Sequence, residues 1–282
     1  GVTDVLGRVV AHKLGEALGQ QVVIDNRPGA SGIVGSQIVA TAPPDGYTLL
    51  MVFPTHVVNP YLFSKVPYDT EKAFAPITIV STVSLLLTVN PDLPVKSTQE
   101  LIAFAKANPN KLNYGTVGSG SLGHLGAELF RSMSGTRMTQ IAYKGSPQVL
   151  SALIGGEINM YMVASISGVM PQLKSGRVRA LGVSTKQSLP VLPDVPPIAY
   201  ALPGYEARGW NGILAPAGTP KAIIDKLNRE IVKVVRSPDF AQNLTNEGAF
   251  AVGNTPEEFA AVIRADMKKW SAVIKEAGIK GE

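Results

Sequence analysis

The sequence predicts an α/β protein of two lobes that the chain joins twice. Segments typical of strands and of helices alternate along the chain, a pattern that predicts parallel sheets covered by helices. Hydrophobic residues make up 45% of the chain and charged residues 17%, a composition typical of compact globular proteins. The length of 282 residues suits two domains or one large domain.

The first lobe is expected to begin with a helix that Thr3 caps and Gly19 ends. Its apolar residues recur every four positions, at Leu6, Val10, Leu14 and Leu18. After this helix the patterns predict a short buried strand, a helix behind a glycine-rich turn, a buried strand, a short helix and one long apolar strand, over residues 22–24, 33–42, 47–53, 58–63 and 77–89.

The second lobe is expected to be organised around a glycine loop that opens a helix. Gly118, Gly120 and Gly123 form a GxGxxG pattern between a short apolar strand and a helical repeat. Main-chain amides at the start of a helix favour an anion, so the loop predicts an anion site. A dinucleotide site needs an acidic residue at the end of the next strand to bind the ribose, and a P-loop needs a lysine after the glycines. This sequence has neither. A carboxylate, a nucleotide and a glycine turn that serves packing alone stay open as alternatives.

The rest of the chain predicts further helices and strands around a proline-rich connection. Ser146 and Pro147 start a short helix. Strands are expected over residues 158–163 and 178–184, with a helical turn between them at 171–175. The three final helices are expected over 219–234, from 237 and from 255. The lobes are expected to comprise residues 1–92 with 214–282, and residues 93–213, with hinge crossings near 89–95 and 210–216.

Composition argues against several classes of function. The chain has no cysteine, and its histidines His12, His56 and His124 lack metal-ligand spacing, so neither a metal nor a cofactor is expected. The net charge of +5 is not gathered into a basic run, so no nucleic acid is expected. The longest apolar run, residues 77–89, is too short to cross a membrane, so no direct membrane insertion is expected. The start at Gly1 lies directly before a helix, which suggests that the natural N-terminus lies upstream.

Several blocks together resemble one family, the periplasmic receptors of tripartite tricarboxylate transporters, often called Bug proteins. The similarity covers nearly all 282 residues. It is carried by the blocks Asp25-Asn26-Arg27-Pro28-Gly29-Ala30, Pro44-Asp45-Gly46-Tyr47, Tyr114-Gly115-Thr116, Tyr143-Lys144-Gly145 and Ala215-Pro216-Ala217-Gly218-Thr219-Pro220. The resemblance implies a two-lobed periplasmic binding protein fold with a ligand cleft between the lobes. It also implies a monomeric, periplasmic receptor that binds a dicarboxylate or an aromatic carboxylate and delivers it to membrane permease subunits.

The chain departs from the family pattern at two places. The family begins with a strand and a Pro-Gly-Gly loop, of which only the four residues from Gly1 to Asp4 are present. The signal peptide and this strand are therefore expected to precede the sequence. Many relatives also carry an aspartate where this chain has Ala164 and Ser165. A ligand with an ammonium group is less favoured for that reason.

No catalytic residue is predicted, and the expected ligand-binding residues come from both lobes. They are Thr3, Asp4, Phe53, Thr55, His56, Ser84, Gly118, Ser119, Gly120, Ser121, His124, Gly145, Ser146, Ala164, Ser165 and Arg208. For His56 and His124 the alternative is a neutral ring bonded to the local main chain. For Phe53 the alternative is a core position. The alternative functions are a nucleotide-binding oxidoreductase that uses the loop at Gly118, and a hydrolase that uses Ser121 and His124.

Overall fold

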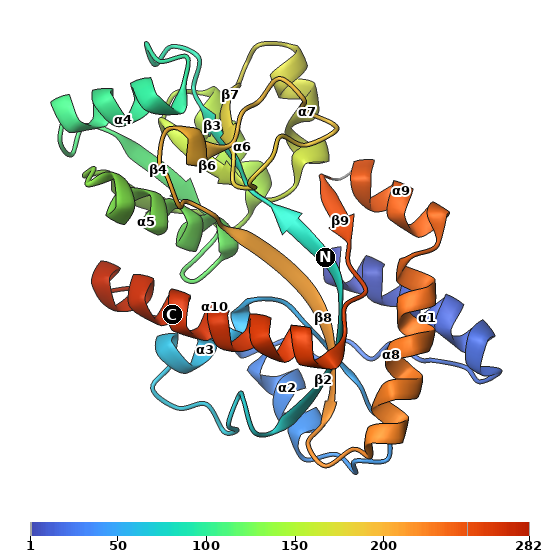
Figure 1. Ribbon diagram of the computed structural model, residues 1–282. Coiled ribbons are helices and arrows are strands. Elements are labelled where there is room, and N and C mark those ends of the chain that lie inside the picture. Colours follow the sequence, from blue (N-terminus) through green and yellow to red (C-terminus); the bar gives the residue numbers. More distant parts are fainter. Residues whose placement is uncertain (1, 247, 282) are drawn as a thin grey trace. The chain divides into compact units, whose positions relative to one another are not determined.

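The structure is a computed structural model that describes residues 2–246 and 248–281 (Figure 1). The chain forms a mixed α/β fold and divides into two compact units. The first unit comprises Gly1–Thr82, Gly209–Leu244 and Ala249–Ser271, and the second comprises Val83–Arg208, Thr245–Gly248 and Ala272–Glu282. The predicted hinge crossings near 89–95 and 210–216 stay a prediction.

The first unit contains a four-stranded sheet in the order β1-β8-β2-β9, in which β1 runs antiparallel to β8. Its elements, some of which end in the second unit, are α1 (Val2–Leu18), the 3-10 turn η1 (Ala30–Gly32), α2 (Ile33–Ala40), β1 (Leu50–Val52), α3 (Thr55–Leu62), β2 (Phe74–Ser84), β8 (Arg208–Pro216), α8 (Lys221–Val235), α9 (Pro238–Asn246), β9 (Ala249–Ala251) and α10 (Pro256–Ala277).

The core of this unit confirms the predicted apolar stripe of the first helix. Leu6, Val10 and Leu14 of α1 are buried in one cluster with Ile224, Leu227 and Ile231 of α8, and the two helices lie side by side (Figure 1). Gly19 ends α1 in the left-handed conformation (φ 64°), as the sequence predicts.

The second unit contains a five-stranded sheet in the order β5-β4-β6-β3-β7. Strand β4 is parallel to both β5 and β6, whereas β3 is antiparallel to β6 and β7. Its elements are β3 (Leu86–Val89), α4 (Thr98–Ala107), β4 (Asn113–Thr116), α5 (Leu122–Ser134), β5 (Thr139–Ala142), α6 (Ser146–Ile154), β6 (Met160–Val163), α7 (Ile166–Lys174), β7 (Arg179–Val183) and the 3-10 turn η2 (Ile198–Tyr200).

Three predicted strands differ from the structure. Residues 22–24 form no strand, and Val23 is 74% exposed, because a short apolar run without a pairing partner does not become a strand. The predicted strand at 47–53 is limited to β1, and Tyr47 is 91% exposed. The single strand predicted at 77–89 is two strands in different sheets. Between them the amide of Leu85 donates to Ser184 Oγ (2.8 Å), so the strand partner changes at this residue.

Some helix boundaries also differ from the prediction. Helix α1 already includes Val2, so Thr3 is not its cap, and Gly145 rather than Ser146 is the N-cap of α6. Helices α3 and α7 begin earlier than predicted, so that Thr55 and His56 lie inside α3 and Pro171 lies inside α7. The short strand β9 was not predicted, because its three residues carry no alternation that distinguishes them from a loop.

Candidate ligand site

Three helices of the second unit begin at the same edge of its sheet. Helices α5, α6 and α7 directly follow β4, β5 and β6 along the chain, and these three neighbouring strands are parallel. Their carboxyl ends therefore share one edge, and the three helix N-termini start from it. The edge gathers nine of the predicted residues: Gly118, Ser119, Gly120, Ser121, His124, Gly145, Ser146, Ala164 and Ser165. Helix N-termini present main-chain N–H groups and partial positive charge, so this edge favours an anion.

The three glycines of the GxGxxG pattern are needed for two different reasons. Gly118 (φ 110°) and Gly120 (φ 72°) have backbone conformations that side chains disfavour. At Gly123 an added Cβ would lie 2.6 Å from the carbonyl oxygen of Met162, so only glycine lets α5 pack this closely on β6. The spacing is thus explained by the turn and by helix packing, and it requires no nucleotide.

The loop before α5 uses some of its own donors. The Gly120 amide donates to His124 Nδ1 (3.2 Å), and the His124 amide donates to Ser121 Oγ (3.3 Å), which caps α5. The Ser121 amide is directed at the Gly118 carbonyl oxygen at 3.4 Å. His124 is therefore bonded to the local main chain, the alternative that the sequence left open.

Other donors of this loop are not used by the described part of the protein. Among the described residues, no acceptor binds the Ser119 amide or hydroxyl, nor the amides of Leu122 and Gly123. Ser119 and Gly123 are half-buried, whereas Leu122 is 3% exposed. Leu122 and Gly123 are not among the donors predicted from the sequence. The signal was present nevertheless, because the first residues of any helix lack intrahelical acceptors.

The N-termini of α6 and α7 contribute fewer groups that could contact a ligand. Gly145, the N-cap of α6, is half-buried, and Ser146 beside it is exposed. Ser165 is the N-cap of α7, and its side chain makes no capping bond, so its exposed hydroxyl is not used by the helix. Ala164 supplies no polar group, and no carboxylate stands at this position.

The geometry disfavours the hydrolase alternative. The Nδ1 atom of His124 faces the Gly120 amide, and Nε2 lies 4.0 Å from Glu128 Oε1. The Ser121 hydroxyl contacts the main-chain amide of His124 rather than the imidazole. A nucleophilic serine requires a base within hydrogen-bond reach of its hydroxyl, and this ring is directed elsewhere.

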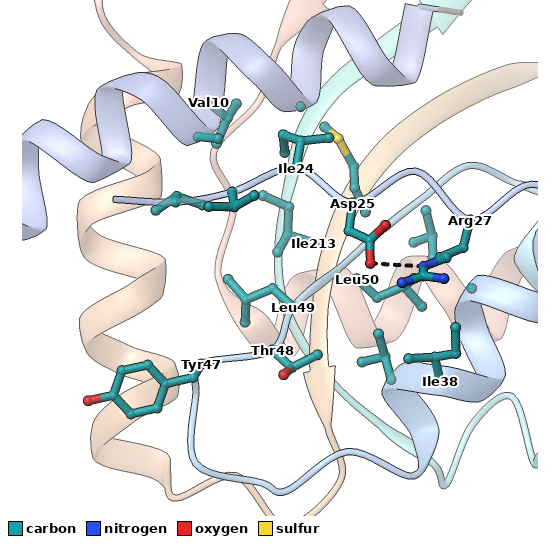
Figure 2. Close-up of a pocket in the computed structure, with 18 of the residues that line it drawn as sticks. Val10, Ile24, Asp25, Arg27, Ile38, Tyr47, Thr48, Leu49, Leu50 and Ile213 are labelled. Atoms are coloured by element: carbon teal, nitrogen blue, oxygen red, sulfur yellow. Dashed lines mark hydrogen bonds and ion pairs between the residues drawn. The ribbon is translucent and has the colours of Figure 1, made fainter. Parts of the chain in front are cut away.

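The first unit has a cavity of about 1200 Å³ that several predicted residues line (Figure 2). Asp4, Phe53, Thr55 and His56 are among them. Most of the wall is apolar, with contributions from Val10, Leu14, Ile24, Ile38, Leu49, Leu50 and Ile213. In the described residues β1 is an edge strand of the sheet, so the cavity adjoins unpaired main-chain groups as well as apolar side chains. Such an edge favours pairing with another extended segment.

Two carboxylates that line this cavity are already paired with neighbouring donors. Arg27 Nε donates to Asp25 Oδ2 at 2.8 Å, as Figure 2 shows. The carboxylate of Asp4 accepts hydrogen bonds from Asn26 Nδ2 (2.6 Å) and Arg8 Nε (3.1 Å), and these bonds hold its pKa below the usual value. The cavity therefore combines mostly apolar walls with paired carboxylates, and Lys226 is also among its lining residues.

The remaining predicted residues have no clear ligand geometry. Ser84 is buried, and its hydroxyl has no partner among the described residues. Arg208 forms an ion pair with Glu206, so its charge is already compensated. The side chain of Thr3 lies outside the described residues.

The comparisons with known proteins identify the family. The sequence model described as "Tripartite tricarboxylate transporter family receptor" matches residues 6–279. The chain belongs to this family. No described helix of this receptor has the length and apolar character that a membrane span requires.

Three solved structures similar to this receptor are informative about the family. The R. palustris protein Rpa4515 with adipate is 37% identical, with a TM-score of 0.84, and the match covers 100% of this chain and 95% of that one. The periplasmic binding protein BugD is 29% identical, with a TM-score of 0.80 and coverages of 100% and 95%. MatC from Rhodopseudomonas palustris with bound malate is 29% identical, with a TM-score of 0.79 and coverages of 96% and 94%. The fold is accordingly that of the Bug-type periplasmic solute-binding proteins.

Proposed function

We propose that this protein is an extracytoplasmic solute receptor that binds a small organic acid and delivers it to the permease of a tripartite tricarboxylate-type transporter. The proposed ligand class is a dicarboxylate or an aromatic carboxylate. The ligand is held by main-chain amides and hydroxyl groups, without chemical conversion.

The observation that carries this proposal is the shared sheet edge of the second unit, where α5, α6 and α7 begin. At this edge the amides of Ser119, Leu122 and Gly123 are not used within the described chain. A hydrogen bond to a charged group contributes about 1.5–3 kcal/mol, so a few such donors reach the roughly 8 kcal/mol of micromolar binding. No arginine is required for this affinity.

Two further observations support a plain carboxylate. The similar proteins Rpa4515 and MatC were solved with adipate and malate, which are both dicarboxylates. The edge after β6 carries Ala164 and Ser165, neither of which has the negative charge that an ammonium group needs. Amino acids are therefore disfavoured relative to acids without an amine.

Calorimetry with a panel of organic acids tests the proposal. The panel contains adipate, malate, benzoate, nicotinate and glutamate, and each is also incubated with the protein and analysed for product. We expect micromolar binding of at least one acid that lacks an amine, with the acid recovered unchanged. If no anion of the panel binds the folded protein, or if a bound acid is converted, the proposed function is wrong.

Serine substitutions test the location of the site. The double variant Ser119→Ala with Ser121→Ala should bind the best acid at least about tenfold more weakly, the loss of about one charge-assisted hydrogen bond. Ser175→Ala is the control, because Ser175 lies at the opposite end of α7, where its hydroxyl donates to the Gln172 carbonyl (3.2 Å). Equal affinities of the two variants would remove the glycine loop from the site.

A further inference from the structure

The glycine loop is held by a histidine ring from inside the protein. The Gly120 amide donates to His124 Nδ1 at 3.2 Å, and both residues are buried. A nitrogen that accepts this bond carries no proton. The ring in this arrangement is therefore the neutral tautomer with its proton on Nε2.

A buried polar cluster on the other side of the ring favours the same tautomer. The Nε2 atom lies 4.0 Å from Glu128 Oε1, so its N–H group is near a negative charge. Glu128 is 5% exposed, and its carboxylate accepts hydrogen bonds from Arg131 Nη1 (2.6 Å) and from the Tyr114 hydroxyl. Arg131 compensates the carboxylate, which weakens the attraction that would otherwise draw a second proton onto the imidazole.

We propose that His124 is a positioning residue of the anion site: its unprotonated Nδ1 binds the Gly120 amide and fixes the loop so that Ser119, Leu122 and Gly123 present their free amides to the ligand. This inference rests on the proposed function. In this role His124 orients the loop and does not contact the ligand.

Protonation of His124 opposes this arrangement. A proton on Nδ1 would place two donors, Nδ1–H and the Gly120 amide, against each other. Burial lowers the pKa of His124, the nearby Glu128 carboxylate acts in the opposite direction, and Arg131 adds to the lowering. Because the pKa of the folded ring lies below that of a free histidine, the ring is neutral at pH 7 and above, and the loop loses its acceptor only as the pH falls.

Two buried tyrosines face α5, Tyr114 on β4 and Tyr205, and burial raises the pKa of each hydroxyl, so neither changes charge in this range. Tyr205 faces α5 directly, because its hydroxyl donates to the Gly126 carbonyl. Glu276 of α10 also contacts this helix, because its carboxylate accepts a hydrogen bond from Ser132 Oγ (2.8 Å). A variant without the imidazole therefore separates its contribution to any pH effect from that of the carboxylates of Glu128 and Glu276.

Two substitutions of His124 separate positioning from simple packing. His124→Asn places an amide oxygen near the position of Nδ1, so it keeps an acceptor for Gly120 but cannot be protonated in this range. His124→Phe keeps a ring of similar shape without an acceptor. With adipate as the probe, or the best acid of the panel if adipate does not bind, we expect His124→Phe to lose at least about tenfold in affinity at pH 7.5. His124→Asn should remain within about threefold of the natural protein.

The pH profile is the decisive measurement. The natural protein should lose more affinity between pH 7.5 and pH 5 than His124→Asn does, and any titration of the acid itself cancels in this comparison. Hydrogen exchange of the Gly120 amide should be slow in the natural protein and in His124→Asn, and fast in His124→Phe. Identical pH profiles, or unchanged affinity of His124→Phe, would overturn the role of His124 alone. If no acid binds the natural protein, the proposed function is wrong. In that case hydrogen exchange still tests the role of His124, because an unchanged exchange rate of the Gly120 amide in His124→Phe would show that the ring does not hold the loop.

Discussion

The hydroxyl of Tyr205 donates a hydrogen bond to the main-chain carbonyl of Gly126 at 3.0 Å. Tyr205 is 1% exposed, and its ring packs edge-on against Phe130 of the same helix, with 6.2 Å between the ring centroids. The bond joins the segment after η2 to the middle of α5. It therefore supports the helix that carries the glycine loop.

Removal of this hydroxyl should destabilise the second unit. Tyr205→Phe keeps the buried ring and loses one hydrogen bond, so we expect the free energy of unfolding to fall by about 1 kcal/mol in urea denaturation. Tyr200→Phe is the matched control, because Tyr200 is 76% exposed and its hydroxyl has no bond among the described residues. Equal stabilities of the two variants would show that the Tyr205 bond contributes nothing.

The contact of Gly123 with Met162 predicts a steric effect on the site. An alanine Cβ would lie 2.6 Å from the Met162 carbonyl oxygen, so Gly123→Ala must shift the start of α5 away from β6. We expect a loss of about 1–3 kcal/mol in stability, as for other overpacked positions, together with weaker binding of the best acid.

Gly168 of α7 provides the control for this substitution. Its added Cβ would lie 3.4 Å from Ser165 Oγ, an ordinary contact. Gly168→Ala should therefore leave stability unchanged or raise it by up to about 1 kcal/mol, the difference in helix propensity. Equal stabilities of Gly123→Ala and Gly168→Ala would show that the close approach to Met162 causes no steric strain.

Asn254, which follows β9, forms hydrogen bonds with the neighbouring strand β2. Its side-chain oxygen accepts a hydrogen bond from the Ile79 amide (2.7 Å), and its main-chain oxygen accepts one from Thr78 Oγ1 (2.8 Å). Asn254→Ala removes the acceptor of a buried amide and should cost about 1–3 kcal/mol in thermal or urea denaturation. Asn254→Asp keeps an acceptor oxygen and should lose less, so an equal loss in both variants would contradict this explanation.

The local part of the candidate site could be predicted from the sequence. The turn at Gly118 and Gly120 and the helix that it opens depend on neighbouring residues only, and the structure contains both. The pattern could not show which way the His124 ring points. That orientation depends on Glu128 one helical turn later and on Tyr114 from β4, a contact that follows from the packing of the helix on the sheet.

The strand errors share one physical cause. Apolar runs show that a segment is buried, but they do not show which strand it pairs with. The predicted strand at 77–89 changes sheet at Leu85, and the residues around Val23 lack a partner despite an apolar sequence. Pairing depends on segments far apart in the chain, such as β1 with β8, and one sequence alone does not contain this information.

The burial of His56 in the first unit predicts a second effect of pH, which acts on the stability of the protein rather than on ligand binding. The imidazole is 3% exposed, its Nδ1 lies 3.3 Å from Ser36 Oγ, and its ring stacks on Tyr68 with 5.9 Å between the centroids. Phe74 contacts the ring edge-on at 4.9 Å. Burial in these surroundings lowers the pKa of His56 to about 4.

Because an unfolded histidine binds its proton near pH 6.5 and the buried His56 only near pH 4, the unfolded state binds more protons between these values. Stability should therefore be independent of His56 above about pH 6.5 and fall as the pH decreases towards 4, by up to about 3 kcal/mol. Urea denaturation at a series of pH values measures this slope. His56→Gln keeps a polar side chain that does not titrate, and it retains His124, so its slope should be shallower than that of the natural protein. Two parallel slopes would mean that the acid sensitivity comes from other groups, and His56 would then have no part in it.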